Sequence, residues 1–159
     1  MTPKLLERTL KFLSRECFLT LFYSGKFPKG PGTAGSVVAL FLGLPILYLS
    51  ANTLFLCALL IGLIAIKQID IYEAQTNSHD DKQIVIDELV GMWMAMAIAG
   101  LSWLGVIASF VFFRLFDIYK PSLIGKIDRD VKGGLGVVGD DALAGICGGF
   151  CALLLAHLF

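Results

Sequence analysis

Long stretches of this sequence carry no charged residue. Asp, Glu, Lys and Arg are absent from residues 37–66, 89–113 and 142–159. Charged residues make up 16% of the chain and hydrophobic residues 57%, whereas soluble domains carry roughly 25% charged residues. A chain of 159 residues has too much surface to consist almost entirely of core. The sequence therefore excludes an ordinary soluble domain and indicates that much of the surface faces lipid.

The chain also lacks an excess of charge of either sign, with 13 basic and 13 acidic residues. This balance argues against a general nucleic-acid-binding protein, which would carry a basic excess. The cysteines form no CxxC pair, and none has an arginine six positions later, which excludes a cysteine-phosphatase loop. We interpret Cys17, Cys57, Cys147 and Cys151 as small packing residues. The nucleophile motif DxDx(T/V) is also absent.

The N-terminal segment has the pattern of an amphipathic helix. Leu6, Leu10, Leu13 and Cys17 recur at helical spacing, with charged residues on the other faces. Such a helix either lies in the membrane interface or packs on the core, and the sequence leaves both alternatives open. The Gly- and Pro-rich residues 24–36 predict a loop, after which Ser36 caps the next helix.

Two uncharged segments predict helical hairpins. Residues 37–66 contain a turn-like cluster at 50–53, which predicts helices over 37–49 and 53–66, the second of which could continue past Lys67. Each would be about 20 Å long, which is short for a hydrocarbon core of about 30 Å. Residues 89–113 form either one membrane span or a second hairpin that turns near residues 100–102. A single span would place Asp87 and Asp117 on opposite sides of the membrane.

The distribution of charge favours the two-hairpin alternative. Both proposed tips are uncharged, and every cationic segment lies at the other ends of the helices. This asymmetry is typical of a protein whose charged loops all lie in the cytoplasm. We therefore predict a single all-α domain over residues 1–159. It would be a membrane-embedded helical bundle of short hairpins with an N-terminal amphipathic helix.

Five carboxylates border the apolar segments: Asp87, Glu88, Asp117, Asp140 and Asp141. Each has an ordinary interpretation by itself, since Asp140 or Asp141 could cap a helix and Asp117 could pair with Arg114. As a cluster they would repel one another unless a cation neutralised them. Oxygen ligands of this kind suit Mg²⁺. Ionisable residues at a membrane edge are also candidates for function.

Basic and hydroxyl side chains supply groups that can bind phosphate. Arg114 and Lys120 flank Asp117, and arginine offers a bidentate fork for a phosphate group. Thr33 and Ser36 lie in the glycine-rich segment GPGTAGS, although it lacks the Gly-Lys-Ser/Thr ending of a nucleotide-binding loop. His79 is either a surface residue or a proton donor or acceptor at the site.

Four motifs occur in an order that resembles the phosphatidylglycerophosphatase A family. They are GPGTAGS, an HD pair followed by IVIDELVGMW, then FFRLFDIYKP, and finally GGLGVVGDDALAG. The resemblance extends from about Tyr23 to Gly145. It implies an all-helical enzyme that uses Mg²⁺ to hydrolyse phosphatidylglycerophosphate to phosphatidylglycerol and phosphate. It also implies a place in the bacterial cytoplasmic membrane, with the active site facing the cytoplasm.

The resemblance assigns roles to residues of this chain. The catalytic residues would be Asp87, Arg114, Asp117 and Lys120. Phosphate would be bound by Thr33, Ser36, His79, Arg114 and Lys120. The metal ligands would come from Asp80, Asp87, Glu88, Asp117, Asp140 and Asp141. The alternatives are a non-enzymatic membrane protein with a carboxylate cation site, or a phosphatase of another lipid phosphate. The sequence leaves the oligomeric state open.

Overall fold

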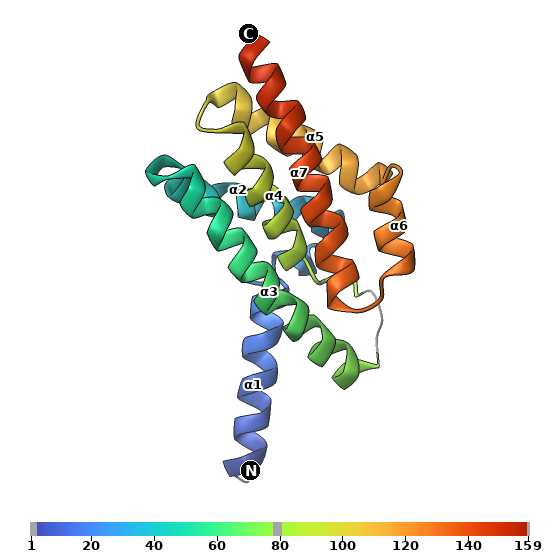
Figure 1. The fold of residues 1–159 in the computed structure, drawn as a ribbon. Helices are drawn as coiled ribbons and strands as arrows, with labels where there is room; N and C mark the ends of the chain where they lie inside the picture. Colours follow the sequence, from blue (N-terminus) through green and yellow to red (C-terminus); the bar gives the residue numbers. More distant parts are fainter. Residues whose placement is uncertain (1–2, 78–80, 159) are drawn as a thin grey trace.

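The computed structural model describes residues 3–77 and 81–158, and all regular structure in them is helical. The helices are α1 (Pro3–Leu19), α2 (Pro31–Leu49), α3 (Ala51–Thr76), α4 (Ile86–Ala99), α5 (Trp103–Tyr119), α6 (Leu123–Asp130) and α7 (Gly134–Leu158), with a short 3-10 helix η1 (Ser24–Lys26). Figure 1 shows them as a bundle from which α1 extends. The predicted all-α fold is confirmed.

Helix α4 lies at the centre of the bundle and packs against α2, α3, α5 and α7. It is buried over nearly its whole length, from Leu89 to Met96. A helix that is apolar on all faces is stable when it is surrounded by other helices or by lipid, and α4 is surrounded by helices. Trp93 fixes α2 on this central helix, because its Nε1 donates a hydrogen bond of 2.7 Å to the backbone oxygen of Ala39.

The first predicted hairpin is present, but its helices are longer than predicted. The chain turns at Ser50, whose Oγ accepts a hydrogen bond from the N–H of Thr53. Helix α2 has 19 residues and α3 has 26, which correspond to about 28 Å and 39 Å. The hairpin is therefore confirmed, but α2 begins at Pro31 rather than at residue 37, and α3 continues past Lys67 to Thr76. Helices α2, α3 and α7 are each long and apolar enough to cross a membrane.

The polar end of α3 stays helical because other elements bind it. Arg15 of α1 donates hydrogen bonds to Gln68 and Gln75, and Asp70 Oδ1 accepts one of 2.7 Å from the N–H of Gly134. Asp70 thereby caps the start of α7. These contacts extend α3 to Thr76, ten residues beyond its uncharged part.

The loop predicted for residues 24–36 ends earlier than expected. Gly30 takes a left-handed conformation with φ 70°, and Pro31 then occupies the first turn of α2, where its fixed φ suits a helix start. Gly35 lies against Val85, so the glycines within this turn allow close packing. Ser36 is inside α2 and donates a hydrogen bond of 2.8 Å to the carbonyl oxygen of Gly32. The prediction that Ser36 caps a helix was therefore wrong.

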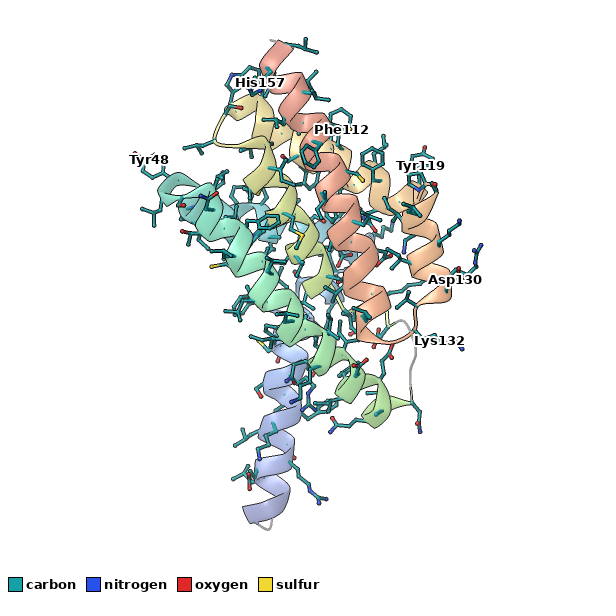
Figure 2. All side chains as sticks on the ribbon, in the orientation of Figure 1. Tyr48, Phe112, Tyr119, Asp130, Lys132 and His157 are labelled. Carbon is teal, nitrogen blue, oxygen red and sulfur yellow. The ribbon has the colours of Figure 1, made fainter. Side chains whose placement is uncertain are left out.

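The second uncharged segment forms a hairpin, and the single-span alternative is wrong. Helix α4 ends at Ala99, and α5 begins at Trp103 after Ser102 caps it through a hydrogen bond from the N–H of Gly105. Both hairpin tips lie toward the end of the bundle that holds the C-terminus (Figure 1). Figure 2 places His157 at that end and Lys132 at the opposite, charged end.

The N-terminal amphipathic helix is confirmed, and among its described side chains those of the second half pack on the bundle. Phe12 stacks on Tyr72 of α3 with ring centroids 5.9 Å apart, and Leu19 is buried. The predicted apolar face does not pack on the bundle at Leu6, Leu10 and Leu13, because these side chains are exposed.

Candidate functional site

A cleft of about 640 Å³ opens at the charged end of the bundle. Its walls come from helices that are far apart in the sequence: the start of α2, the start of α4, the end of α5, and parts of α3, α6 and α7. The residues that line it include Gly32, Glu73, Lys82, Asp87, Glu88, Arg114, Asp117, Lys120, Asp128, Lys132, Asp140 and Asp141. The structure thus brings together all five carboxylates that border the apolar segments.

Three of these carboxylates form a tight group that could hold a metal ion. Asp87 and Glu88 lie in the first turn of α4 and Asp141 lies in α7, and one oxygen of each is within 4.8 Å of the others. Among the described residues, Asp87 Oδ1, Glu88 Oε2 and Asp141 Oδ2 are buried oxygens without a hydrogen-bond partner. Buried negative oxygens are costly unless a cation neutralises them. Three oxygen donors fit a hard divalent cation such as Mg²⁺.

A close crossing of two helices holds this carboxylate group together. Gly91 lies one turn after Asp87 in α4, and Gly145 lies one turn after Asp141 in α7. A Cβ on Gly145 would overlap the backbone of Gly91, and a Cβ on Gly91 would lie 2.6 Å from the backbone oxygen of Asp141. The two backbones can approach this closely only because neither position has a side chain.

Arg114, near the end of α5, also lines the cleft. Its Nη1 is 2.5 Å from Asp117 Oδ2 and 3.9 Å from Glu88 Oε1, and its Nη2 donates to Thr33 Oγ1 at 3.5 Å. The pairing of Asp117 with Arg114 is therefore present within the cleft. The Nε–H of Arg114 is buried without an acceptor among the described residues.

Lys120 sits in an ion-pair network at the edge of the cleft. Its Nζ is 2.5 Å from Asp128 of α6 and 2.6 Å from Asp140 of α7. Partial burial lowers the pKa of Lys120, but the two carboxylates outweigh it and hold this pKa above its ordinary value. Lys120 therefore stays protonated at neutral pH, and Asp140 pairs with it rather than joining the group of three.

Some predicted site residues are not in the cleft. Ser36 is fully buried within α2 and does not line the cleft, so its phosphate-binding role stays a prediction. His79 and Asp80 lie outside the described residues.

Sequence reasoning also missed five charged residues that line the cleft: Glu73, Asp81, Lys82, Asp128 and Lys132. They occur in polar segments, where a charged residue carries no signal of its own. Asp128 is the exception, because the sequence around it has the strongly amphipathic pattern of α6 and follows Lys120 closely.

Comparison with known proteins identifies the family. The model of the family described as phosphatidylglycerophosphatase A matches residues 17–156, nearly the whole chain. The chain belongs to the phosphatidylglycerophosphatase A family. Its predicted resemblance is thereby confirmed, and the chain is a phosphatase.

Individual relatives agree with this family membership. The Escherichia coli phosphatidylglycerophosphatase A is 35% identical over 142 residues, which cover 86% of this chain and 80% of that protein. The Haemophilus influenzae phosphatidylglycerophosphatase A is 38% identical over 131 residues, covering 79% and 78%. A Bacteroides thetaiotaomicron relative, 34% identical over 80% of this chain and 84% of its own length, is provisionally named a phosphatidylinositol-3-phosphatase. No solved structure matches the chain.

Proposed function

We propose that this enzyme removes the terminal phosphate from phosphatidylglycerophosphate to give phosphatidylglycerol and phosphate. The reaction would use Mg²⁺ held by Asp87, Glu88 and Asp141. One observation carries this proposal: three buried carboxylate oxygens without partners lie in the same cleft as an arginine donor without an acceptor. A divalent cation would neutralise the carboxylate oxygens, and a phosphate group would accept a hydrogen bond from the arginine.

The metal and the cleft residues have separate tasks. When bound, Mg²⁺ supplies positive charge that polarises the phosphate ester. Arg114 would bind the phosphoryl oxygens through its spare Nε–H, while Asp117 and Thr33 keep the guanidinium in place. Charge on the transferring phosphoryl group is stabilised by such fixed donors.

The start of α2 supports this phosphate position. The first backbone N–H groups of a helix have no partner within the helix and favour anions. Gly32 belongs to this first turn, and a Cβ added to it would lie 3.2 Å from Arg114 Nη1 and would also overlap Glu88 Oε1. The α2 backbone at Gly32 therefore lies beside both Glu88 and Arg114, with no room for a side chain between them.

The charge asymmetry of the bundle supports a cytoplasmic site in a bacterial inner membrane. The hairpin tips carry no charge, whereas the cleft and the basic segments share the opposite end. Basic segments remain on the cytoplasmic side of a membrane. The acyl chains of the lipid would stay in the bilayer while its head group enters the cleft.

Metal removal tests the proposal directly. We expect phosphate release from phosphatidylglycerophosphate in detergent to fall at least about 100-fold when the enzyme is treated with EDTA. Added Mg²⁺ should restore the activity, because each of the three carboxylates keeps a buried oxygen without a hydrogen-bond partner among the described residues. The same assay should include phosphatidylinositol 3-phosphate, since one relative carries that substrate in its name. Undiminished release after chelation would reject the metal, and faster release from the inositol lipid would reject the substrate.

Replacing Arg114 by lysine should lower kcat/KM by about 100-fold. Lysine has a single ammonium group, which cannot pair with Asp117, contact Thr33 and bind phosphate at once. Initial-rate kinetics at saturating Mg²⁺ measure the effect. Arg129→Lys is the matched control, because Arg129 is exposed and pairs with its neighbour Asp130 outside the cleft. Equal rates for the two variants would exclude phosphate binding by Arg114.

A further inference from the structure

The turn that follows α1 has an unusual backbone. Leu21, Phe22 and Tyr23 have φ values of 46°, 55° and 65°, and three successive left-handed residues without a glycine are rare. Hydrogen bonds fix this conformation: the N–H of Phe22 donates to Cys17 O at 2.9 Å, and that of Tyr23 donates to Thr20 Oγ1 at 3.1 Å. The turn therefore presents its side chains in fixed directions.

In this conformation some apolar side chains of the turn are buried and others are exposed. Leu21 is 4% exposed and belongs to the core, whereas Phe22 is 72% exposed and Tyr23 is 45% exposed. Phe27, just after η1, is 60% exposed. Three aromatic side chains from one short segment thus project from the bundle, which is costly in water unless something covers them.

Basic residues and a membrane-spanning helix adjoin these aromatic side chains. Lys26 Nζ lies 4.9 Å from the ring centroid of Tyr23 and pairs with Glu16 at 2.7 Å. Lys29 is exposed, and α2 begins at Pro31, four residues after Phe27. Aromatic rings beside lysines at the end of a spanning helix are typical of the membrane–water interface.

The same turn supports one wall of the cleft. The N–H of Val85 donates to Leu19 O at 2.9 Å, and Gly25 lies so close to Gln83 O that a Cβ there would overlap it. Lys82 and Ile84, from the segment held in this way, line the cleft. The position of the turn therefore affects the position of the cleft wall.

We propose that Phe22, Tyr23 and Phe27 form an aromatic anchor that inserts into the head-group layer of the bilayer. The occupant of this surface is lipid, because the surface continues into the lipid-facing α2 and carries lysines suited to lipid phosphates. The anchor holds the adjoining cleft at the depth where the phosphate of a lipid lies. This inference goes beyond the reaction and does not depend on its substrate.

Fluorescence quenching can locate the anchor. Phe22→Trp keeps an aromatic ring on the same backbone. The protein is placed in phosphatidylcholine–phosphatidylglycerol vesicles, and the emission of the added tryptophan is the difference between the variant and the wild type. We expect shallow brominated phospholipids to quench this added emission and aqueous iodide to leave it largely unchanged. Gln75→Trp, at the exposed polar end of α3, is the water-facing control. Quenching of the Phe22→Trp emission by iodide, without quenching by brominated lipid, would overturn the proposal. Quenching does not depend on catalytic activity, so this experiment tests the anchor separately from the proposed reaction.

A second experiment tests what the anchor does. The triple change of Phe22, Tyr23 and Phe27 to serine should lower kcat/KM about tenfold for long-chain lipid in vesicles, relative to a short-chain water-soluble analogue. The matched control changes Tyr48, Leu49 and Trp103 to serine, because these exposed residues lie at the hairpin tips away from the cleft. A long-chain to short-chain ratio equal to that of wild type would overturn the proposed role.

Discussion

Asp141→Asn is expected to reduce phosphate release at least about 100-fold and yet to stabilise the metal-free protein. Asp141 is 3% exposed, and its Oδ2 has no hydrogen-bond partner among the described residues. Asp87 and Glu88 each place an oxygen within 4.8 Å of it. Without a cation these negative charges repel one another in a buried site. A neutral amide removes one of them while keeping the shape of the side chain.

The size of the stability change follows from the burial of this group. Removing one uncompensated buried charge should stabilise the metal-free protein by about 1–3 kcal/mol. The wild type gains stability when a cation binds its folded state, and the variant should lose most of this gain. Sites arranged for function commonly cost stability in this way.

Thermal unfolding in detergent, with EDTA or with excess Mg²⁺, measures both effects. In EDTA the Tm of Asp141→Asn should exceed that of wild type, and in Mg²⁺ the order should reverse. Asp130→Asn is the matched control, because Asp130 is exposed and pairs with Arg129. If Asp141→Asn were less stable in EDTA and still gained stability from Mg²⁺, the three carboxylates would not be the metal ligands.

The hairpins were predictable because segments that lie in a membrane rarely contain charged residues. The uncharged tips favoured a hairpin in both charge-free segments, and the structure turns at Ser50 and Ser102, each of which caps the following helix. The start of α2 was missed because Gly30, Pro31 and Gly32 are typical of loops. The helix at the start of α2 packs against Val85, a residue about 50 positions away. The local sequence cannot predict such a distant contact.

The convergence of the carboxylates was predictable, whereas their division of roles was not. Asp140 and Asp141 are neighbours and look equivalent in the sequence. Adjacent residues of a helix point about 100° apart, so Asp141 faces α4 while Asp140 pairs with Lys120. The second partner of Lys120, Asp128, lies in a charged segment that resembles any solvated surface. Its sequence signal is limited to the amphipathic pattern of α6, and the packing of α6 against α7 brings it to Lys120.

Gly145→Ala is expected to weaken metal binding at least about tenfold although it alters no ligand. The added Cβ would lie 2.7 Å from the carbonyl carbon and 2.8 Å from the Cα of Gly91. Backbone atoms cannot move aside as a flexible side chain does, so α4 and α7 must separate at this crossing. Asp141 lies one turn from Gly145, and Asp87 lies one turn from Gly91. Their carboxylates would therefore move apart.

Gly149→Ala separates this positional effect from a general loss of stability. Gly149 lies on the same face of α7, one turn farther from the carboxylates, and a Cβ there would lie 2.9 Å from Ala95 O. Overpacking of either position should cost about 1–3 kcal/mol, so both variants should unfold at lower temperature in EDTA. Only Gly145→Ala should also need a higher Mg²⁺ concentration for half-maximal activity and show a smaller Mg²⁺-induced rise in Tm. Equal Mg²⁺ requirements in the two variants would mean that the helix crossing stabilises the bundle without setting the spacing of the ligands.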